Sequence, residues 1–288
     1  MLRIENVSKT YGNGVHALKD VSLEIPKGMF GLLGPNGAGK STLMRTIATL
    51  QGVDAGRLFF DEVDVLKEKH QVRKILGYLP QEMGVYPGMP AEALLDHFAV
   101  LKGLVSAGER REIVERLLRM TNLYDVRRRK LGTFSGGMRR RFGIAQALLG
   151  DPELIIVDEP TAGLDPEERV RFHNLLCEIG ETAVVILSTH IVEDVRELCS
   201  RMAILAKGRV LLHGEPGALV ARLEGKVWRK VVGRSEVSRY QESMTVLSTR
   251  LAGGRTIVDV QSDQSPGDGF EPAEPDLEHV YFATLHDS

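Results

Sequence analysis

The feature that most constrains the fold is a glycine-rich loop between a strand-like run and a helix-like run. Residues 34–41 read Gly-Pro-Asn-Gly-Ala-Gly-Lys-Ser; they follow the apolar run Met29–Leu33 and precede Leu43 and Ile47 at helical spacing. Strand, loop and helix in this order are the context of a phosphate-binding P-loop, which belongs to α/β folds. The alternative, a glycine-rich turn without a ligand, is disfavoured because all three parts are present. The loop therefore predicts binding of a nucleoside triphosphate.

Each residue type in this loop has a chemical reason. The glycines let backbone N–H groups turn toward phosphates, and the following helix N-terminus adds a favourable dipole. Lys40 would supply a positive charge and Ser41 a ligand for Mg²⁺. The expected nucleotide-binding residues of the loop are Gly34, Pro35, Asn36, Gly37, Ala38, Gly39, Lys40, Ser41 and Thr42.

A second apolar strand, Leu154–Val157, ends in two carboxylates, Asp158 and Glu159. Open α/β sheets bind ligands at the carboxyl ends of their strands, so both side chains should face the phosphates. Asp158 suits a Mg²⁺ partner, and Glu159 is placed to orient and deprotonate an attacking water. Adjacent acids after a strand are alternatively a solvated turn or a helix cap. The P-loop favours the hydrolytic interpretation.

The order of apolar segments predicts the fold class. Strands alternate with helices to about Gly214, which is typical of a mainly parallel sheet covered by helices. Period-two alternation in Leu2–Ile4 and Val21–Ile25 indicates an antiparallel β subdomain. Between Pro90 and Thr133 apolar residues recur every three or four positions, which predicts an inserted helical subdomain. The expected fold is α/β: a P-loop NTPase sheet with both subdomains and a small C-terminal β-rich domain.

We divide the chain near residue 220. Residues 1–220 form the expected ATP-binding domain, with the helical subdomain at about 85–150, and residues 221–288 form an accessory domain. The accessory domain includes a Pro- and Gly-rich segment, 264–275, which we interpret as a flexible spacer. The terminal segment, 277–285, has apolar residues at helical spacing, and we expect this helix to dock within the same chain.

Composition narrows the possible partners. The net charge is −2, from 37 basic and 39 acidic residues, so no strong field draws the chain to nucleic acid or to an anionic membrane. The basic run Arg127–Lys130 is interpreted as a solvated face. Apolar runs fall short of the ~20 residues that cross a bilayer, and the N-terminus lacks a signal-peptide core. We expect a cytosolic chain that reaches membranes through a partner, with Cys177 and Cys199 as reduced structural thiols.

A third motif distinguishes this chain from other P-loop proteins. Phe134-Ser-Gly-Gly-Met138, followed by Arg139–Arg141, resembles the signature motif of ABC ATPases. The resemblance covers residues 1 to about 215 in the family's order: Tyr11, the P-loop, Gln81, the signature, Asp158-Glu159, Gly163-Leu164-Asp165 and His190. The chain is therefore similar to ATP-binding subunits of ABC transporters, above all to bacterial ABC-2-type export ATPases.

The resemblance implies a second phosphate site in the signature. Ser135, Gly136 and Gly137 open a helix, and in this family that helix end completes the ATP site of a second subunit packed head to tail. Met138 departs from the family, which commonly has Gln there, and a thioether cannot replace the amide's hydrogen bond to the opposite nucleotide. Function is therefore expected to require a pair of ATP-binding subunits.

The remaining motif residues take their roles from the same resemblance. Tyr11 resembles the aromatic residue that stacks on adenine, and Gln81 resembles the sensor of Mg²⁺ and water; a core tyrosine and a surface amide are the alternatives. His190 resembles the switch histidine beside Glu159, and Asp165 an inter-subunit loop residue. The expected catalytic residues are Glu159, His190 and Gln81, and the expected Mg²⁺-binding residues are Ser41, Gln81 and Asp158.

The architecture implied by the resemblance favours a transport subunit. The long coiled coil, zinc cysteines and fused second ATPase of the chromosome, repair and ribosomal classes are not found in this sequence. Residues 81–87 resemble the segment that receives a membrane subunit, and residues 275–281 resemble the tail of drug, lipid or polysaccharide export ATPases.

We therefore expect an ATP-hydrolysing subunit that powers export at the cytoplasmic face of the cell membrane. The expected cofactors are ATP and Mg²⁺. The expected partners are integral-membrane permease subunits and a second ATP-binding subunit, as a homodimer, without nucleic acid. The alternative is a soluble ABC-type ATPase that acts on ribosomes or DNA. Residues 221–288 are hypothesised to regulate or dimerise the subunit.

Overall fold

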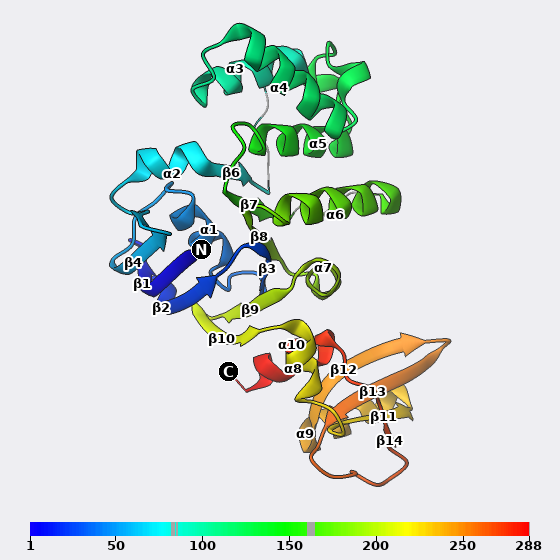
Figure 1. Cartoon of the computed structure of the whole chain (residues 1–288). Helices are drawn as coiled ribbons and strands as arrows, with labels where there is room; N and C mark the ends of the chain where they lie inside the picture. The colour runs from blue at the N-terminus through cyan, green and yellow to red at the C-terminus, as the bar shows by residue number, and fades with distance from the viewer. Residues whose placement is uncertain (82–83, 85, 160–164, 288) are drawn as a thin grey trace.

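A six-stranded sheet forms the centre of the molecule. The computed structural model describes residues 1–81, 84, 86–159 and 165–287 (Figure 1). Along the sheet the strands are β10 (Arg209–Gly214), β9 (Arg201–Ala206), β3 (Gly28–Leu33), β8 (Val184–Thr189), β7 (Leu154–Asp158) and β6 (Leu76–Leu79). Neighbouring strands are parallel except for the β9–β10 hairpin. Every residue of β7 and β8 is buried, as expected for parallel strands covered on both faces. The predicted α/β sheet is confirmed.

A second, antiparallel sheet covers one face of the central sheet. Its strands, in order, are β2 (His16–Ile25), β1 (Leu2–Thr10), β4 (Ala55–Phe60) and β5 (Val63–Asp64). Its buried side chains share one core with α1 (Lys40–Ile47) and with the facing side of β3, β7 and β8. Helix α2 (Lys69–Ile75) then leads into β6. This arrangement confirms the antiparallel β subdomain.

Helices form the upper part of the molecule in Figure 1. They are α3 (Ala91–Leu101), α4 (Ala107–Met120) and α5 (Gly136–Ala147), with the short 3-10 turns η1 (Tyr124–Val126) and η2 (Leu131–Thr133) between α4 and α5. Leu94, Leu117 and Phe142, one from each helix, are almost completely buried in a common core. Apolar residues at intervals of three and four place one face of each helix inward, so the inserted helical subdomain is confirmed.

Two helices cover the other side of the central sheet: α6 (Pro166–Gly180) and α7 (Val192–Leu198). Helix α6 begins at Asp165, whose Oδ1 accepts a hydrogen bond from the main-chain N of Glu168 at 2.8 Å. An aspartate cap followed by proline is a strong start signal for a helix. Asp165 therefore has a local capping role. Gly163 and Leu164, which the family resemblance also singled out, lie outside the described residues.

A separate small sheet follows the β10 strand and helix α8 (Pro216–Ala221). Its strands, in order, are β12 (Thr245–Ala252), β13 (Arg255–Gln261), β11 (Val227–Val232) and β14 (Glu271–Pro272). Helix α9 (Val237–Ser243), preceded by the turn η3 (Arg234–Glu236), packs on it and contributes Tyr240 to its core.

The interpretation of residues 264–275 as a spacer needs a correction. Strand β14 pairs with β11, and Phe270 is buried, because an aromatic side chain and an edge pairing anchor this otherwise polar segment.

The last helix, α10 (Leu277–His286), docks within the same chain, as expected. Leu277, Val280 and Tyr281 are buried where α10 meets α7, α8, β9 and β12. Burial of such side chains contributes about 1.5–3 kcal/mol each. The helix therefore joins the small sheet to the central core.

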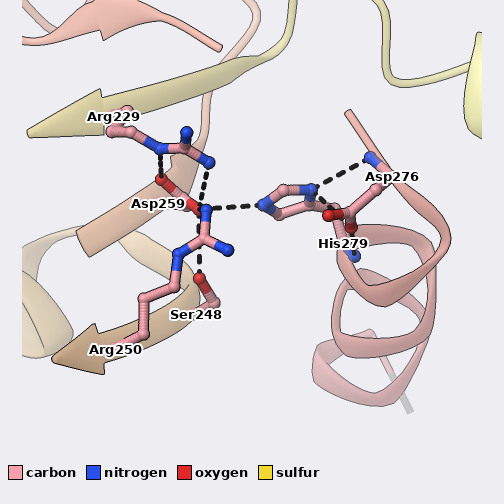
Figure 2. A network of polar contacts seen from close by, with 6 residues as sticks. All are labelled: Arg229, Ser248, Arg250, Asp259, Asp276 and His279. Carbon is pink, nitrogen blue, oxygen red and sulfur yellow. Dashed lines mark hydrogen bonds and ion pairs between the residues drawn. The ribbon is translucent and has the colours of Figure 1, made fainter. Parts of the chain in front are cut away.

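A buried polar network fixes α10 to the small sheet (Figure 2). Asp259, which is completely buried, accepts two hydrogen bonds from Arg229, at 2.6 and 2.9 Å. Ser248 and Arg250 donate to the same carboxylate, both at 3.1 Å. His279 Nε2 from α10 lies 3.0 Å from Asp259 Oδ2. Each oxygen of the buried charge is thereby hydrogen-bonded, which a stable buried carboxylate requires.

Candidate active site

The glycine-rich loop lies between β3 and α1, and at two of its glycines the backbone packs too closely on its neighbours for a side chain. A Cβ atom at Gly34 would lie 2.2 Å from the carbonyl oxygen of Leu205. Gly39 has a φ of 109°, and a Cβ there would lie 2.5 Å from the carbonyl oxygen of Ala17. Both positions require glycine, because the loop packs directly on the backbone of its neighbours.

Lys40 points from the start of α1 back into this loop. Its Nζ donates hydrogen bonds to the carbonyl oxygens of Gly34 at 2.6 Å and Pro35 at 3.1 Å. Burial lowers the pKa of Lys40, while the nearby carboxylates of Glu159 and Asp158 oppose that shift. A cation is thus held among backbone groups at a helix N-terminus, where anions bind favourably.

A cleft of about 560 Å³ opens in front of the loop. This volume lies in the range of small-ligand sites and accommodates a nucleotide. Of the predicted site residues, the cleft is lined by Tyr11, Pro35, Asn36, Gly37, Ala38, Gly39, Lys40, Ser41, Thr42, Gln81 and Glu159. Its other walls come from Val15, His16, Ala17, Lys19 and Lys207, which the sequence reasoning missed. Lys207 appeared only as part of a hairpin turn, and no local pattern placed it beside the loop.

Gln81 and Glu159 line this cleft, and His190, which is not among its lining residues, contacts the same Glu159 carboxylate. The carboxylate of Glu159 accepts a hydrogen bond from Gln81 Nε2 at 2.9 Å through Oε2, and its Oε1 lies 2.9 Å from His190 Nδ1. The main-chain N of Glu159 donates to the carbonyl of Ser188 at 2.8 Å. Glu159 also has a φ of 47°, an uncommon value for a residue other than glycine. The three predicted catalytic residues are therefore brought together.

Asp158 precedes Glu159 and is only 5% exposed. Burial raises the pKa of Asp158, and the Glu159 carboxylate raises it further, whereas Lys40 and Arg140 oppose both. The described residues hold no group of three or more His, Cys, Asp or Glu side chains that could retain a metal ion by themselves. A Mg²⁺ ion that is also coordinated by phosphate oxygens needs only one or two ligands from the protein, and Ser41 and Asp158 can provide them.

Tyr11 also lines the cleft. The residue is 37% exposed, which does not fit the core-tyrosine alternative. Its hydroxyl lies 3.1 Å from Thr42 Oγ1 and donates to Gln51 Oε1 at 3.2 Å. The ring is thus tied to α1 and partly open to the cleft, and stacking on a base remains a prediction.

The signature residues lie elsewhere. Ser135 caps α5, and its Oγ accepts the main-chain N–H of Met138 at 3.1 Å. Ser135 and Gly136 are exposed, Gly137 is buried, and none of the three is among the described residues that line the P-loop cleft. A single chain therefore does not bring its signature to its own P-loop.

Comparison with known proteins identifies relatives of this arrangement. The family model described as ABC transporter matches residues 18–162. The linearmycin resistance ATP-binding protein LnrL of Bacillus subtilis is 37% identical over 78% of this chain and 72% of its own length. The uncharacterised ABC transporter ATP-binding protein YxlF of the same organism is 31% identical over 99% of this chain and 100% of its own.

Solved structures agree with the relatives found by sequence. A dimeric ATP-binding cassette in a post-hydrolysis state, bound to ADP and Pi, matches with a TM-score of 0.69 and 28% identity; the match covers 75% of this chain and 98% of that one. The structure of an ATP-binding subunit of an ABC transporter matches with a TM-score of 0.70 and 28% identity, over 77% of this chain and 92% of its own. These solved ATP-binding cassettes thus have the same fold as about three quarters of this chain.

Proposed function

The chain belongs to the ABC transporter ATP-binding family, and from this premise we propose that two such subunits, packed head to tail, hydrolyse MgATP to power export through separate membrane subunits. The observation that carries the hydrolytic part is the position of the Glu159 carboxylate. It lines the P-loop cleft and is held between Gln81 and His190. A carboxylate fixed at this point is placed to take a proton from a water that attacks the terminal phosphate.

The loop and Lys40 bind and orient the phosphates. Backbone N–H groups of residues 36–41 and the α1 N-terminus supply a positive potential, and the Lys40 ammonium adds a full charge. Tyr11 supports this proposal as an exposed aromatic ring tied to the same helix. The Mg²⁺ ion, when bound, would neutralise charge on the phosphate oxygens, and Ser41 and Asp158 are the residues proposed to hold it, with Gln81 beside them.

His190 and Gln81 orient the base. Each contacts a different oxygen of Glu159, and together these contacts fix the orientation of the carboxylate plane. Lone-pair positions that remain open on those oxygens point to where a water can be held. We assign proton acceptance to Glu159 and orientation of the water and of the carboxylate to Gln81 and His190.

The position of the signature supports the pair of subunits. Ser135 and Gly136 are exposed at the start of a twelve-residue helix and lie away from the cleft of their own chain. A second subunit, turned to face the first, would offer its own signature to this cleft. Dimeric cassettes are among the solved structures that match.

The names of related proteins and an exposed aromatic residue support the proposal of export at a membrane. The doxorubicin resistance ATP-binding protein DrrA of Mycobacterium tuberculosis is 35% identical over 80% of this chain and 70% of its own length. Such names do not support the ribosome or DNA alternative. In the described part of the chain no helix is long and apolar enough to cross a membrane, so the proposed peripheral position at the cytoplasmic face requires membrane subunits. Tyr86, 62% exposed, lies in the segment proposed to receive them, whose residues 82, 83 and 85 are outside the described residues.

The accessory part begins near residue 220 in this proposal. The small sheet has a core of its own around Tyr240, Val258 and Phe270, which supports the division, while α10 ties it to the central core. We propose that residues 221–288 regulate or dimerise the subunit. Their removal should change the ATPase rate, dimerisation or transport, and unchanged values for all three would contradict this role.

The ATPase part is tested with the purified chain. Phosphate release should be saturable in ATP, require Mg²⁺ and disappear in a Lys40→Ala variant that retains the circular dichroism spectrum of the wild type. Release that persists in the variant would place hydrolysis outside this cleft.

A further inference from the structure

Arg140 joins three carbonyl groups of the active site. It lies on α5, five residues after the capping Ser135. Its guanidinium donates hydrogen bonds to the main-chain oxygen of Gln81 at 2.9 Å and to that of Asp158 at 2.9 Å, and it also donates to the main-chain oxygen of Glu159. The sequence marked this residue only as the middle member of a basic run.

The three acceptors belong to the two segments that carry the catalytic side chains. Gln81 follows β6, Asp158 is the last residue of β7, and Glu159 follows it. The side chains of Gln81 and Glu159 are themselves hydrogen-bonded, so Arg140 and this contact close a ring between the two segments. Backbone and side chain of both residues are therefore fixed relative to each other.

The backbone of Glu159 needs such support. Its φ of 47° lies in the left-handed region, which a residue with a Cβ seldom adopts unless its surroundings hold it there. Ser188 holds the Glu159 N–H from the β8 side, and Arg140 holds the Glu159 carbonyl from the α5 side. A change at Arg140 releases one of these two restraints.

Only an arginine side chain has the geometry for this task. A guanidinium presents five N–H donors in a planar fork, whereas lysine has a single point of charge on a flexible stem. Arg140 is half-buried, and burial lowers its pKa, while the nearby Asp158 and Glu159 carboxylates raise it. The positive charge and the planar set of N–H donors both contribute. Substitution by lysine keeps the charge and removes the planar donors, so it distinguishes the two contributions.

We propose that Arg140 is a positioning residue for hydrolysis: it holds Gln81 and Glu159 in register and connects them to the helix that the signature opens. This inference deepens the proposed function and rests on it, because the head-to-tail pair would place the partner's nucleotide at Ser135. Binding of the partner's nucleotide at the signature would then affect the position of α5, and through Arg140 the position of the chain's own Glu159 carboxylate.

The first test compares Arg140→Ala with Arg140→Lys. Arg140→Ala should lower kcat at least tenfold and leave the KM for ATP within threefold, because Lys40 and the loop are untouched. Arg140→Lys should retain the charge and recover only part of kcat. Arg116→Ala is the matched control, since Arg116 is an exposed arginine of the helical subdomain that pairs with Asp151 at 3.4 Å, and it should match the wild type.

Folding is separated from positioning by the midpoint of thermal unfolding and by ATP binding. A kcat within twofold of the wild type in Arg140→Ala, or a rise in KM with kcat unchanged, overturns the inference. If Arg140→Ala does not fold, the Arg140→Lys variant provides the test. A folded Arg140→Lys variant with the full kcat of the wild type also overturns the inference. Lack of ATPase activity in the wild type contradicts the proposed function instead, so the two failures are distinguishable.

The connection to the signature is tested with a double substitution. Ser135→Ala and Arg140→Ala should each reduce kcat, and the combined loss should be smaller than the product of the two single losses, because both act through Glu159. Losses that multiply would show that the two residues act independently and would overturn this connection.

Discussion

Gln81 Nε2 donates a hydrogen bond to Glu159 Oε2 at 2.9 Å, although the two residues are 78 positions apart in sequence. The helical subdomain and strand β7 lie between them in sequence, so this contact joins the two segments that flank the subdomain. His190, from the end of β8, contacts the other carboxylate oxygen. A movement of the helical subdomain would therefore change the surroundings of the proposed base directly, and would link the nucleotide to the proposed membrane subunits.

Glu159→Gln should remove hydrolysis and keep nucleotide binding. Charge and shape change little around the P-loop, whereas the proton acceptor is lost, so kcat should fall by about 10²–10⁴-fold. ATP should then trap the closed pair, which size-exclusion chromatography with and without ATP detects. Near-normal turnover in this variant would remove Glu159 from its proposed role.

Gly39→Ala should abolish tight ATP binding. The φ of 109° is strained for alanine, and its Cβ would meet the Ala17 carbonyl at 2.5 Å, so the loop must shift. Binding measured by calorimetry should weaken at least tenfold. Gly52→Ala is the control, because a Cβ at Gly52 has no heavy atom within 4 Å and the φ there is not positive. Equal affinities for both variants would contradict the proposed cradle.

Local sequence predicted the motifs of the central fold well. The strand before the P-loop, the strand before Asp158 and the Lys207-Gly208 hairpin all appear, because period, turn residues and apolar runs act over a few residues. Long-range placement was harder. Arg140 and Lys207 reach the site through tertiary packing, and β14 is a two-residue edge pairing inside a polar segment. No pattern over neighbouring residues encodes such contacts.

Asp259→Asn should destabilise the small sheet. The substitution leaves Arg229 and His279 around a neutral amide; because Arg229 remains partly exposed to water, the main loss is that of hydrogen bonds to a charged group, about 1.5–3 kcal/mol. Urea unfolding can be followed by the fluorescence of Trp228, the only tryptophan, which lies on β11 in the same sheet. Asp263→Asn, at an exposed ion pair with Lys226, is the control and should change the unfolding free energy by less than about 1 kcal/mol.

The stability difference between the wild type and Asp259→Asn should depend on pH. Burial by itself raises the pKa of Asp259, but hydrogen bonds from His279 and Arg229 hold it well below its usual range. A carboxylate with a lowered folded pKa stabilises the protein above its unfolded pKa of about 3.9 and loses that contribution as pH falls below it. The difference should stay constant from pH 7 to about 5 and shrink below about 4. A difference that grows with acid would refute the network.

The two cysteines should differ in reactivity. Cys177 is exposed, whereas Cys199 is buried and burial raises the pKa of its thiol strongly. Thiolates are the reactive species, so a disulfide reagent at pH 8 should label one thiol per folded chain and two after denaturation. Cys177→Ser should remove the fast reaction. Labelling of two thiols in the folded protein would contradict the packing of α7 on the sheet.

The most direct test of the central claim is purification of the tagged chain from solubilised native membranes, with ATPase activity measured on the eluate. We predict that a multi-span membrane protein co-purifies, that it changes the ATPase rate, and that the activity is lost when the tagged chain carries Glu159→Gln. Recovery of the chain with ribosomes or DNA, and without a membrane protein, would leave the ATPase intact and contradict the transport function.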